Sequence, residues 1–316
     1  MAGGVRRALI QVHLWIGIGL GLYILMMSVT GSAIVARREL TRHWLPDTVA
    51  ADGRARAEPG RLRELAQALY PGWHIVAIQL DTRPLRPGQY ARDAARTPQV
   101  PAARPVEMTL ARGAERITRR FDPYSGADLG DVYPAPYRAL LALVELHDNL
   151  LGGRTGRFVN GLAAIATTLL LLTGLIVWWP GAGRGWRASL RVSRGASWRT
   201  QLRQLHNTLA IWPFVLLLLW ALSGIYFSFP EPFEATKDWF FPANSARAAT
   251  GDMLLNWLAT LHFGRFGGTG VRVAWIVLGL VPGALFVTGA MMWWYSVLQP
   301  SLRRSRAHPA RAKGGA

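Results

Sequence analysis

Apolar residues gather in four long windows of the chain that contain no Asp, Glu, Lys or Arg. The windows cover residues 8–36, 158–183, 204–230 and 273–302. An α-helix needs about 20 residues to cross the hydrocarbon core of a bilayer, and each window is longer than that. Because backbone groups in lipid must be hydrogen-bonded within the segment, we expect four membrane-spanning helices. The first window exceeds the apolar region of a cleaved signal peptide, which has about 7–15 residues.

Basic residues outside the windows predict the orientation of the spans. The segment 180–205 has six Arg and the tail after residue 302 has five basic residues, and neither has an acid. The segment 231–271 has three basic residues against four acids. The positive-inside rule therefore places both termini and the segment 180–205 in the cytoplasm. We attribute the net charge of +18 to topology and to contact with membrane lipids, and expect no nucleic acid as a partner.

Residues 37–140 are of mixed charge and are predicted to form a small extracytoplasmic α+β domain. The chain has no cysteine, so this domain has no disulfide, and thiolate metal sites and iron–sulfur clusters are excluded. The residue pattern predicts a helix over 61–70, strands over 73–80, 106–111 and 116–121, and a loop or irregular hairpin over 84–105. A turn follows at 121–126, where Asp122 and Ser125 are turn-forming residues to which we assign no catalysis.

The windows contain an internal match. His13 is followed 17 residues later by Thr30-Gly31, and His206 is followed 17 residues later by Ser223-Gly224. His147 and His262 are each followed by Gly-Gly after five residues, Thr-Gly after 26 and Trp-Trp after 31. Agreement at three paired offsets is improbable by chance. We therefore predict a parallel duplication, in which a pseudo-two-fold axis along the membrane normal relates the first span to the third and the second to the fourth.

The duplication sorts the four histidines into two pairs. His13 and His206 lie at the cytoplasmic ends of their windows, whereas His147 and His262 precede the second and fourth windows on the outer side. Ionisable residues at membrane depth are costly and usually face the bundle interior or a bound group. Two His on facing helices are the ligand set of a b-type haem, so we predict two haem b groups, with the four His as ligands of the haem iron.

Other residues near the histidines fit or compete with this hypothesis. Glycines leave room for a flat macrocycle, at positions Gly17, Gly19, Gly21, Gly152, Gly153, Gly156, Gly264, Gly267, Gly268 and Gly270. Four arginines are candidate partners of haem propionates, namely Arg154, Arg157, Arg265 and Arg272. A structural or proton-handling role for the four His and a different metal remain open. Zinc is disfavoured because it needs three or four protein ligands.

The remaining signals of the membrane part are weaker. Trp178-Trp179 and Trp293-Trp294 stand where an interfacial aromatic belt is expected, and Pro180 is expected to end the second helix. Three further histidines lie outside the repeat and are treated as ordinary, namely His43, His74 and His308. We find no P-loop, nucleophile elbow or HExxH motif.

Two features together resemble a known family. The turn Phe121-Asp122-Pro123-Tyr124-Ser125-Gly126 resembles the D-x-x-(T/S)-G turn before the last strand of PepSY domains. The His, T/S-G and Trp-Trp motifs resemble those of the PepSY-associated transmembrane family of bacterial inner membranes, over nearly the whole chain. The first helix departs from the family pattern, because it has Val12-His13 in place of Leu-His.

The resemblance implies an all-α membrane bundle of four spans, with an inserted PepSY-like periplasmic domain and both termini inside. The expected divisions are residues 1–36, 37–140, 141–183, 184–230, 231–271 (a periplasmic loop) and 272–316. Some members of the family resemble haem-containing reductases for ferric siderophores. This implies that His13, His206, His147 and His262 are haem ligands.

The same resemblance implies electron transfer from the inner haem to the outer haem, and then to a periplasmic ferric chelate in iron uptake. The sequence shows no flavin or nicotinamide site, so we expect a quinol or a separate reductase as electron donor. A different class of function remains open, namely a membrane-anchored PepSY regulator of an extracytoplasmic peptidase or other partner without redox activity. A small-molecule transporter is disfavoured because the spans lack a buried acid pair.

Overall fold

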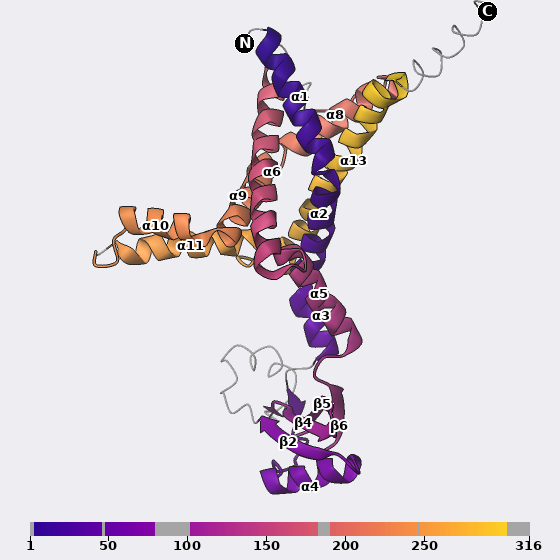
Figure 1. The fold of residues 1–316 in the computed structure, drawn as a ribbon, viewed down its shortest axis with the longest axis vertical. Helices are drawn as coiled ribbons and strands as arrows, with labels where there is room; N and C mark the ends of the chain where they lie inside the picture. The colour runs from indigo at the N-terminus through magenta and orange to yellow at the C-terminus, as the bar shows by residue number, and fades with distance from the viewer. Residues whose placement is uncertain (1–2, 46–47, 80–101, 183–189, 246, 302–316) are drawn as a thin grey trace, which may run out of the picture. The chain divides into compact units, whose positions relative to one another are not determined.

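The structure is a computed structural model that describes residues 3–45, 48–79, 102–182, 190–245 and 247–301. The chain divides into two compact units (Figure 1). One consists of Met1–Ala36 with Ala142–Ala316, and the other is Arg37–Leu141. We call them the helical unit and the inserted unit and describe each by itself.

The helical unit contains two helices that are long and apolar enough to cross a membrane. These spans are Gly153–Trp179, within α6 (Gly153–Ala182), and Thr269–Ser301, formed by α12 (Thr269–Gly279), α13 (Val281–Trp293) and the π-helical turn η1 (Trp294–Leu298). Two pairs of shorter helices meet the same criteria only when each pair counts as one bent span. They are α1 (Gly3–Gly19) with α2 (Gly21–Val35), and α8 (Trp198–Ile211) with α9 (Phe214–Ser228). The described residues therefore form two to four candidate spans.

The two bent pairs have their breaks at corresponding places, which the hydrophobic pattern alone does not predict. The α1–α2 pair bends by 58° at Leu20 and the α8–α9 pair bends by 62° at Trp212-Pro213. Leu20 and Pro213 each come seven residues after a histidine, His13 and His206 respectively. Pro213 has no backbone N–H and breaks the hydrogen-bond ladder of the helix.

The bend in the first pair adjoins a close contact. A Cβ added at Gly21 would come within 1.9 Å of the ring of Phe286 on α13. Glycine at this position therefore allows α2 and α13 to approach each other.

Pro180 does not end the second long helix, contrary to our expectation. The helix α6 continues to Ala182. Proline removes one N–H hydrogen bond from a helix, but near a helix end few later turns depend on that bond. The sequence-based boundary was therefore too early.

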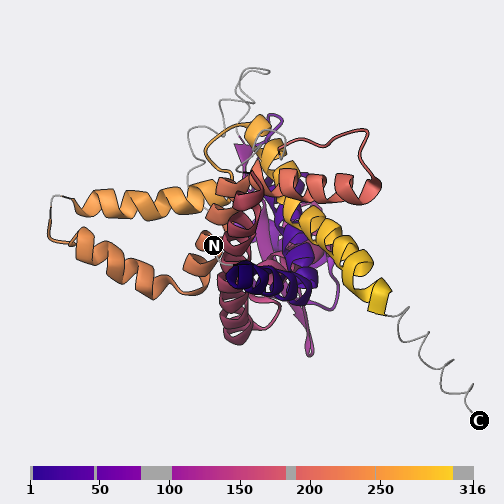
Figure 2. The same cartoon turned by 90° about the horizontal axis from the view of Figure 1, so that it is seen from above.

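The helices of this unit pack in two matching arrangements. The half-helix α1 packs against α6, and α8 packs against α13. The half-helix α2 packs against α12 and α13, and α9 packs against α6. Figures 1 and 2 show these helices gathered in one bundle. Ser28 of α2 hydrogen-bonds to backbone groups on both sides of the break between α12 and α13. Its hydroxyl donates to the carbonyl of Gly279 (2.6 Å) and accepts from the N–H of Gly283 (3.0 Å).

Residues 231–271 are not simply a loop, as the sequence-based division had it. They contain most of α10 (Pro230–Phe240) and all of α11 (Ala248–His262), which form a helical hairpin. The hairpin extends sideways from the other helices of the unit (Figures 1 and 2). Lys237 of α10 donates to Asp252 of α11 (2.9 Å), and Gly251 packs closely against the side chains of Lys237 and Phe241.

The inserted unit is a small α+β domain, and the predicted class is correct. Its elements include α3 (Arg37–Trp44), β1 (Val49–Ala50), α4 (Pro59–Leu69), β2 (His74–Gln79), β3 (Ala102–Ala103), β4 (Val106–Arg112), β5 (Glu115–Phe121) and β6 (Asp128–Asp131). The main sheet is antiparallel with strand order β2-β4-β5-β6, and β1 pairs separately with β3. The helix α5 (Ala135–Asn149) follows and continues into the helical unit.

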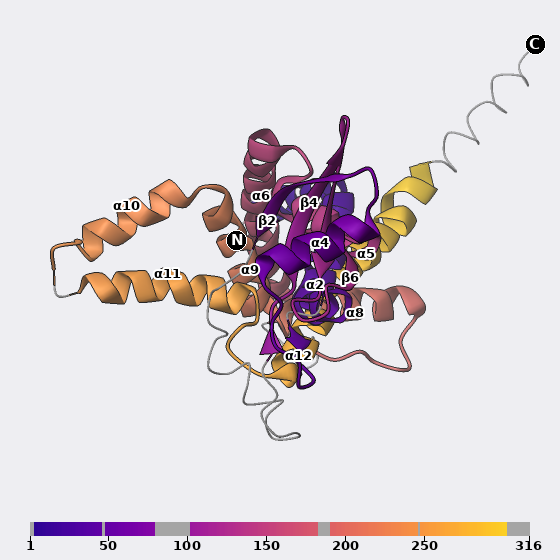
Figure 3. The same cartoon turned by 90° about the horizontal axis from the view of Figure 1, so that it is seen from below.

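The core of this domain lies between α4 and one face of the sheet (Figure 3). Alternate residues of β4 are fully buried, namely Val106, Met108 and Leu110, together with Leu62 and Ala66 of α4. The period-two burial of β4 and the helical spacing of Leu62 and Ala66 agree with the strand and the helix predicted there, although Leu69 of the predicted apolar face is exposed. The two-residue strand β3 falls in the predicted loop 84–105, and the part of that loop up to residue 101 lies outside the described residues.

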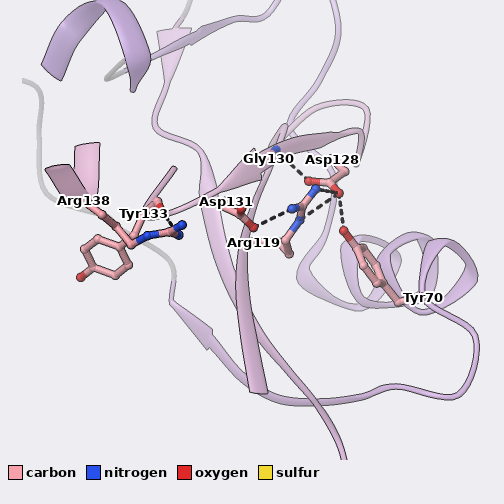
Figure 4. Close-up of polar contacts among 7 residues, drawn as sticks. All are labelled: Tyr70, Arg119, Asp128, Gly130, Asp131, Tyr133 and Arg138. Atoms are coloured by element: carbon pink, nitrogen blue, oxygen red, sulfur yellow. Dashed lines mark hydrogen bonds and ion pairs between the residues drawn. The ribbon is translucent and has the colours of Figure 1, made fainter. Parts of the chain in front are cut away.

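Polar contacts hold the last strand against the domain (Figure 4). The guanidinium of Arg119 on β5 donates to Asp128 and to Asp131 of β6, at 2.6 Å in each case. The hydroxyl of Tyr70 donates to the same carboxylate of Asp128. Because Asp128 binds groups from both β5 and the end of α4, this cluster fixes the edge strand β6, which has few apolar residues of its own.

The turn before β6 has the expected hydrogen bonds. One carboxylate oxygen of Asp122 accepts from the N–H of Tyr124 (2.8 Å), and the other accepts from the hydroxyl of Ser125 (2.6 Å). Gly126 has φ +71° and packs against Leu65. These contacts are those of the turn-forming role predicted for Asp122 and Ser125.

Candidate cofactor-binding site

Each of the four repeated histidines lies against a hydroxyl group on another helix of the helical unit. In all four cases the ring nitrogen involved is Nδ1, and the hydroxyl belongs to the Thr or Ser of a T/S-G motif. Nδ1 of His13 also lies 3.1 Å from the carbonyl oxygen of Leu170, to which a protonated Nδ1 donates. The distances are 3.3 Å for His13 to Thr173, 3.0 Å for His147 to Thr30, 2.8 Å for His206 to Thr288 and 2.6 Å for His262 to Ser223. The motifs that the sequence places at matched offsets are therefore in direct contact in space.

The contacts are exchanged between neighbouring helices. His13 on α1 lies against Thr173 on α6, while His147, just before α6, lies against Thr30 on α2. The same exchange occurs later in the chain. His206 on α8 lies against Thr288 on α13, and His262 on α11 lies against Ser223 on α9. A His and a Thr 17 residues apart would be about 26 Å apart along a straight helix, and the bends of 58° and 62° leave them far apart, so each histidine takes its hydroxyl partner from another part of the chain.

The hydroxyl groups indicate which nitrogen of each imidazole carries the proton. Thr30, Thr173, Ser223 and Thr288 each place their hydroxyl 2.6–2.9 Å from the carbonyl four residues earlier. A hydroxyl has a single proton, and here that proton goes to the carbonyl. The hydroxyl then accepts a hydrogen bond from Nδ1–H of the His. We therefore assign the proton to Nδ1, which leaves the lone pair of Nε2 available to a metal.

Glycines beside these hydroxyl groups leave room for the imidazole rings. A Cβ added at Gly31 would lie 2.9 Å from Cε1 of His147, and one at Gly174 would lie 2.9 Å from Cε1 of His13. At Gly289 the corresponding distance to His206 is 3.5 Å, an ordinary contact. At Gly224 the nearest atom belongs to Ala164 instead, at 3.4 Å. The T/S-G motif thus supplies a hydrogen-bond acceptor for the ring and, at two positions, the space that the ring occupies.

The other glycines near the histidines are of two kinds. A Cβ at Gly21 would meet Phe286, one at Gly156 would meet the carbonyl of Asn149 at 1.7 Å, and one at Gly267 would meet Val271, so these glycines allow close packing. A Cβ would have no neighbour within 4 Å at Gly19, Gly153, Gly268 and Gly270. Room for a macrocycle beside the histidines stays a prediction.

The outer histidines are also held through their backbone. The amide of Asn160 on α6 donates to the carbonyl oxygens of His147 (2.9 Å) and Asp148 (3.0 Å). The indole of Trp220 donates to the carbonyl of His262 (3.1 Å), and that of Trp275 donates to the carbonyl of Leu261 (2.9 Å). These donors satisfy the last carbonyls of α5 and α11, which have no partner within their helices.

Sequence reasoning assigned no role to these donors. Asn160 and Trp275 each come 13 residues after an outer histidine, so they occupy equivalent positions. The offset comparison did not detect them because it matches residue types, and an amide and an indole share only the N–H group. Tyr23 on α2 completes the contacts of Asn160, since its hydroxyl donates to the amide oxygen at 2.6 Å.

The two outer histidines lie in a buried environment. Burial and the nearby His147 both lower the pKa of His262, and burial lowers the pKa of His147. Among the described residues no three His, Asp or Glu side chains form a group that could hold a metal ion.

The four arginines have several kinds of surroundings. Arg157 forms an ion pair with Asp148, Arg265 lies over the ring of Phe263 at 4.3 Å from its centroid, and Arg272 donates to the hydroxyl of Thr269 (3.1 Å). Arg154 is exposed. A role with haem propionates stays a prediction for all four. Of the other histidines, His43 and His74 are exposed on the inserted unit, and His308 lies outside the described residues.

Comparison with known proteins gives one result. Residues 10–251 and 241–295 match the family model described as PepSY-associated TM region. No curated protein matches the chain.

Proposed function

Since the chain belongs to the family of the PepSY-associated TM region, we propose that it is an electron-transfer protein of the bacterial inner membrane that holds two b-type haems. Its acceptor is periplasmic, a ferric siderophore or similar ferric chelate, and its activity is that of a ferric-chelate reductase in iron uptake. The observation that carries this proposal is the set of four His–hydroxyl contacts, which leave Nε2 of each histidine available.

The proposal includes four spans arranged as a parallel duplication. Several matched features support it, including the helix breaks seven residues after His13 and after His206. The contacts of α1 with α6 and of α8 with α13 correspond, as do the exchanged hydroxyl contacts. In this arrangement both termini are cytoplasmic and the inserted PepSY-like unit is periplasmic.

The donor set fits haem better than it fits other metals. A b-type haem would be held by two imidazoles, and the pairs His13 with His206 and His147 with His262 would supply them. When bound, haem supplies reversible one-electron transfer. A hydrogen bond from Nδ1–H to a hydroxyl fixes the ring orientation and raises the basicity of Nε2, as is usual for metal-binding histidines.

The residues of the chain have distinct tasks in this proposal. The four hydroxyl groups orient the rings, and Gly31 and Gly174 allow the rings to lie against the helices. Asn160 and Trp220 hold the backbone at the outer pair. The electron donor is a quinol or a separate reductase, because the sequence contains no flavin or nicotinamide motif.

The decisive experiment is a reduced-minus-oxidised absorption spectrum of the purified full chain, with haem quantified per chain. We expect the α-band of a bis-histidine b-type haem and two haems per chain. His147→Ala and His13→Ala should each retain one haem, and the two remaining haems should differ in midpoint potential. His74→Ala is the matched control, because His74 is exposed on β2 outside the helical unit.

Two results would contradict the proposal. The first is absence of haem bands after expression in haem-replete cells, which would leave the membrane-anchored regulator as the better hypothesis. The second is retention of both haems in His147→Ala, which would assign the ligands to other residues. Reduction of a ferric chelate by the reduced protein then tests the acceptor separately from the cofactor.

A further inference from the structure

The two Trp-Trp motifs each divide into an outward and an inward residue. Trp179 and Trp294 are exposed, at 69% and 47%, as expected of an interfacial belt. Trp178 and Trp293 are partly buried, and the indole nitrogen of each is inaccessible and has no hydrogen-bond partner among the described residues. Trp178 and Trp293 occupy equivalent positions, 31 residues after His147 and after His262.

Both buried indoles lie on the helix faces that contact the inner histidines. Trp178 comes four residues after Gly174, and Trp293 comes four residues after Gly289, so each Trp shares a helix face with that glycine. Gly174 is the residue against which His13 packs, and Gly289 is in contact distance of His206. Long side chains of a helix lean back toward its N-terminus, which brings each indole toward the preceding turn and its histidine.

A buried N–H without an acceptor is unfavourable and rare in native proteins. Two such groups at equivalent positions are still less expected, since each Trp comes four residues after a glycine that lies against an inner histidine. Trp220 and Trp275 show the usual situation in this protein, because each donates to a backbone carbonyl. The unpartnered N–H groups of Trp178 and Trp293 are therefore best explained by acceptors on a bound ligand.

We propose that Trp178 and Trp293 donate their indole N–H groups to the ligand held between His13 and His206. This inference rests on the proposed function, under which the acceptors are the two propionate carboxylates of the inner haem. Each indole would donate to one of these carboxylates. A hydrogen bond to a carboxylate is stronger than a neutral one, so these indoles retain and tune the inner haem.

The test uses Trp178→Phe and Trp293→Phe in the full chain, because phenylalanine keeps an aromatic ring and removes only the N–H donor. Trp179→Phe and Trp294→Phe are the matched controls, one residue away on the exposed side. Haem content per chain and redox titration are measured in each variant. A His147→Ala background, which is expected to keep only the inner haem, assigns any change to that haem.

We expect Trp178→Phe and Trp293→Phe to make the midpoint potential of the inner haem more negative, and the double variant to shift it further. The reason is that an uncompensated carboxylate near the iron favours the ferric form. The controls should leave both potentials unchanged. The bending band of the propionates in resonance Raman spectra of the same variants gives a second readout.

Several outcomes would overturn the inference. Unchanged inner potential and unchanged propionate band in the double variant would show that the indoles meet no ligand, while the proposed function stands. A change in the midpoint potential of the outer haem alone would show that the indoles do not donate to the inner haem. Absence of haem signals in the unsubstituted protein would overturn both the proposed function and this inference.

Discussion

The hydroxyl of Ser223 lies 2.6 Å from Nδ1 of His262 and 2.6 Å from the carbonyl of Leu219, so it accepts from the histidine and donates to its own helix. This relay recurs at all four repeated histidines, with Thr in place of Ser at the other three. It fixes the tautomer of each imidazole and its position along the partner helix.

Removing one of these hydroxyl groups should weaken haem binding at a single site. We expect Thr288→Val, which keeps the side-chain shape, to weaken retention of the inner haem by about 10-fold to 100-fold, as for other groups that hydrogen-bond a metal ligand. The measurement is the rate of haem transfer to an apo-globin acceptor. Thr168→Val on α6 is the control, because the hydroxyl of Thr168 bonds to the carbonyl of Ala164. Equal rates in both variants would contradict the assigned role.

The glycines of the T/S-G motifs should differ in their tolerance of alanine. Gly31→Ala would place a Cβ 2.9 Å from the ring of His147, which is too close, so the ring must move. We expect this variant to lose the outer haem and to keep the inner haem. Gly224→Ala, at the equivalent position of the second half, meets only Ala164 at 3.4 Å and should keep both haems. Haem per chain measured as the pyridine haemochrome distinguishes the two cases, and identical haem content would refute the steric argument.

The predicted orientation of the spans can be tested with single cysteines, because the chain has none of its own. Ser193 and Ala243 are both exposed, the first in the basic segment 180–205 and the second in the connection between α10 and α11. We expect a membrane-impermeant maleimide added to intact spheroplasts to label Ala243→Cys and not Ser193→Cys. In inverted vesicles the result should reverse. Labelling of both sites from one side would contradict the four-span arrangement.

Asp122 should make the stability of the inserted unit depend on pH. Burial acts to raise the pKa of Asp122, but hydrogen bonds from Ser125 and from the N–H of Tyr124, with the nearby Arg54, outweigh it and lower the pKa. The stabilisation is therefore complete above the unfolded-state pKa of about 3.9 and is lost as the pH falls through the lower folded-state pKa.

Asp122→Asn should consequently lower the free energy of unfolding of this unit by about 1–3 kcal/mol at neutral pH, since buried donors lose a charged acceptor. Hydrogen–deuterium exchange of peptides covering β5 and β6 in the full chain measures this difference after correction for intrinsic rates. The difference between variant and unsubstituted protein should shrink toward pH 3. A difference that is constant with pH would show that the carboxylate charge does not contribute.

The fold was predictable where a repeating pattern had a single structural explanation. The long apolar windows of α6 and of α12–α13 are such cases, as is the alternating burial of β4. The two-residue strand β3 was missed because two residues contain no alternation to detect. The hairpin of α10 and α11 was missed because its helices carry charged residues and lie between the apolar windows.

For the candidate site, the sequence singled out residues that the structure brings into contact, but it did not show which residue contacts which. The offset match singled out His13, Thr30, His147 and Thr173, yet it could not say that His13 meets Thr173 and that His147 meets Thr30. That pairing depends on how α1, α2 and α6 pack, which no local pattern encodes. The different orientation of Trp178 and Trp179 was hidden for the same reason, since both look alike in an apolar window.

Under the proposed duplication, the exchange of histidines and hydroxyl groups has an evolutionary consequence. The first half contains both members of each of its two His–Thr contacts, so its two spans could be held together without the second half. Each proposed histidine pair takes one member from each half. A two-span ancestor that formed a symmetric homodimer would then have had both histidine pairs on its symmetry axis. Fusion of two gene copies would have freed one half to keep the large inserted domain while the other kept a short helical hairpin.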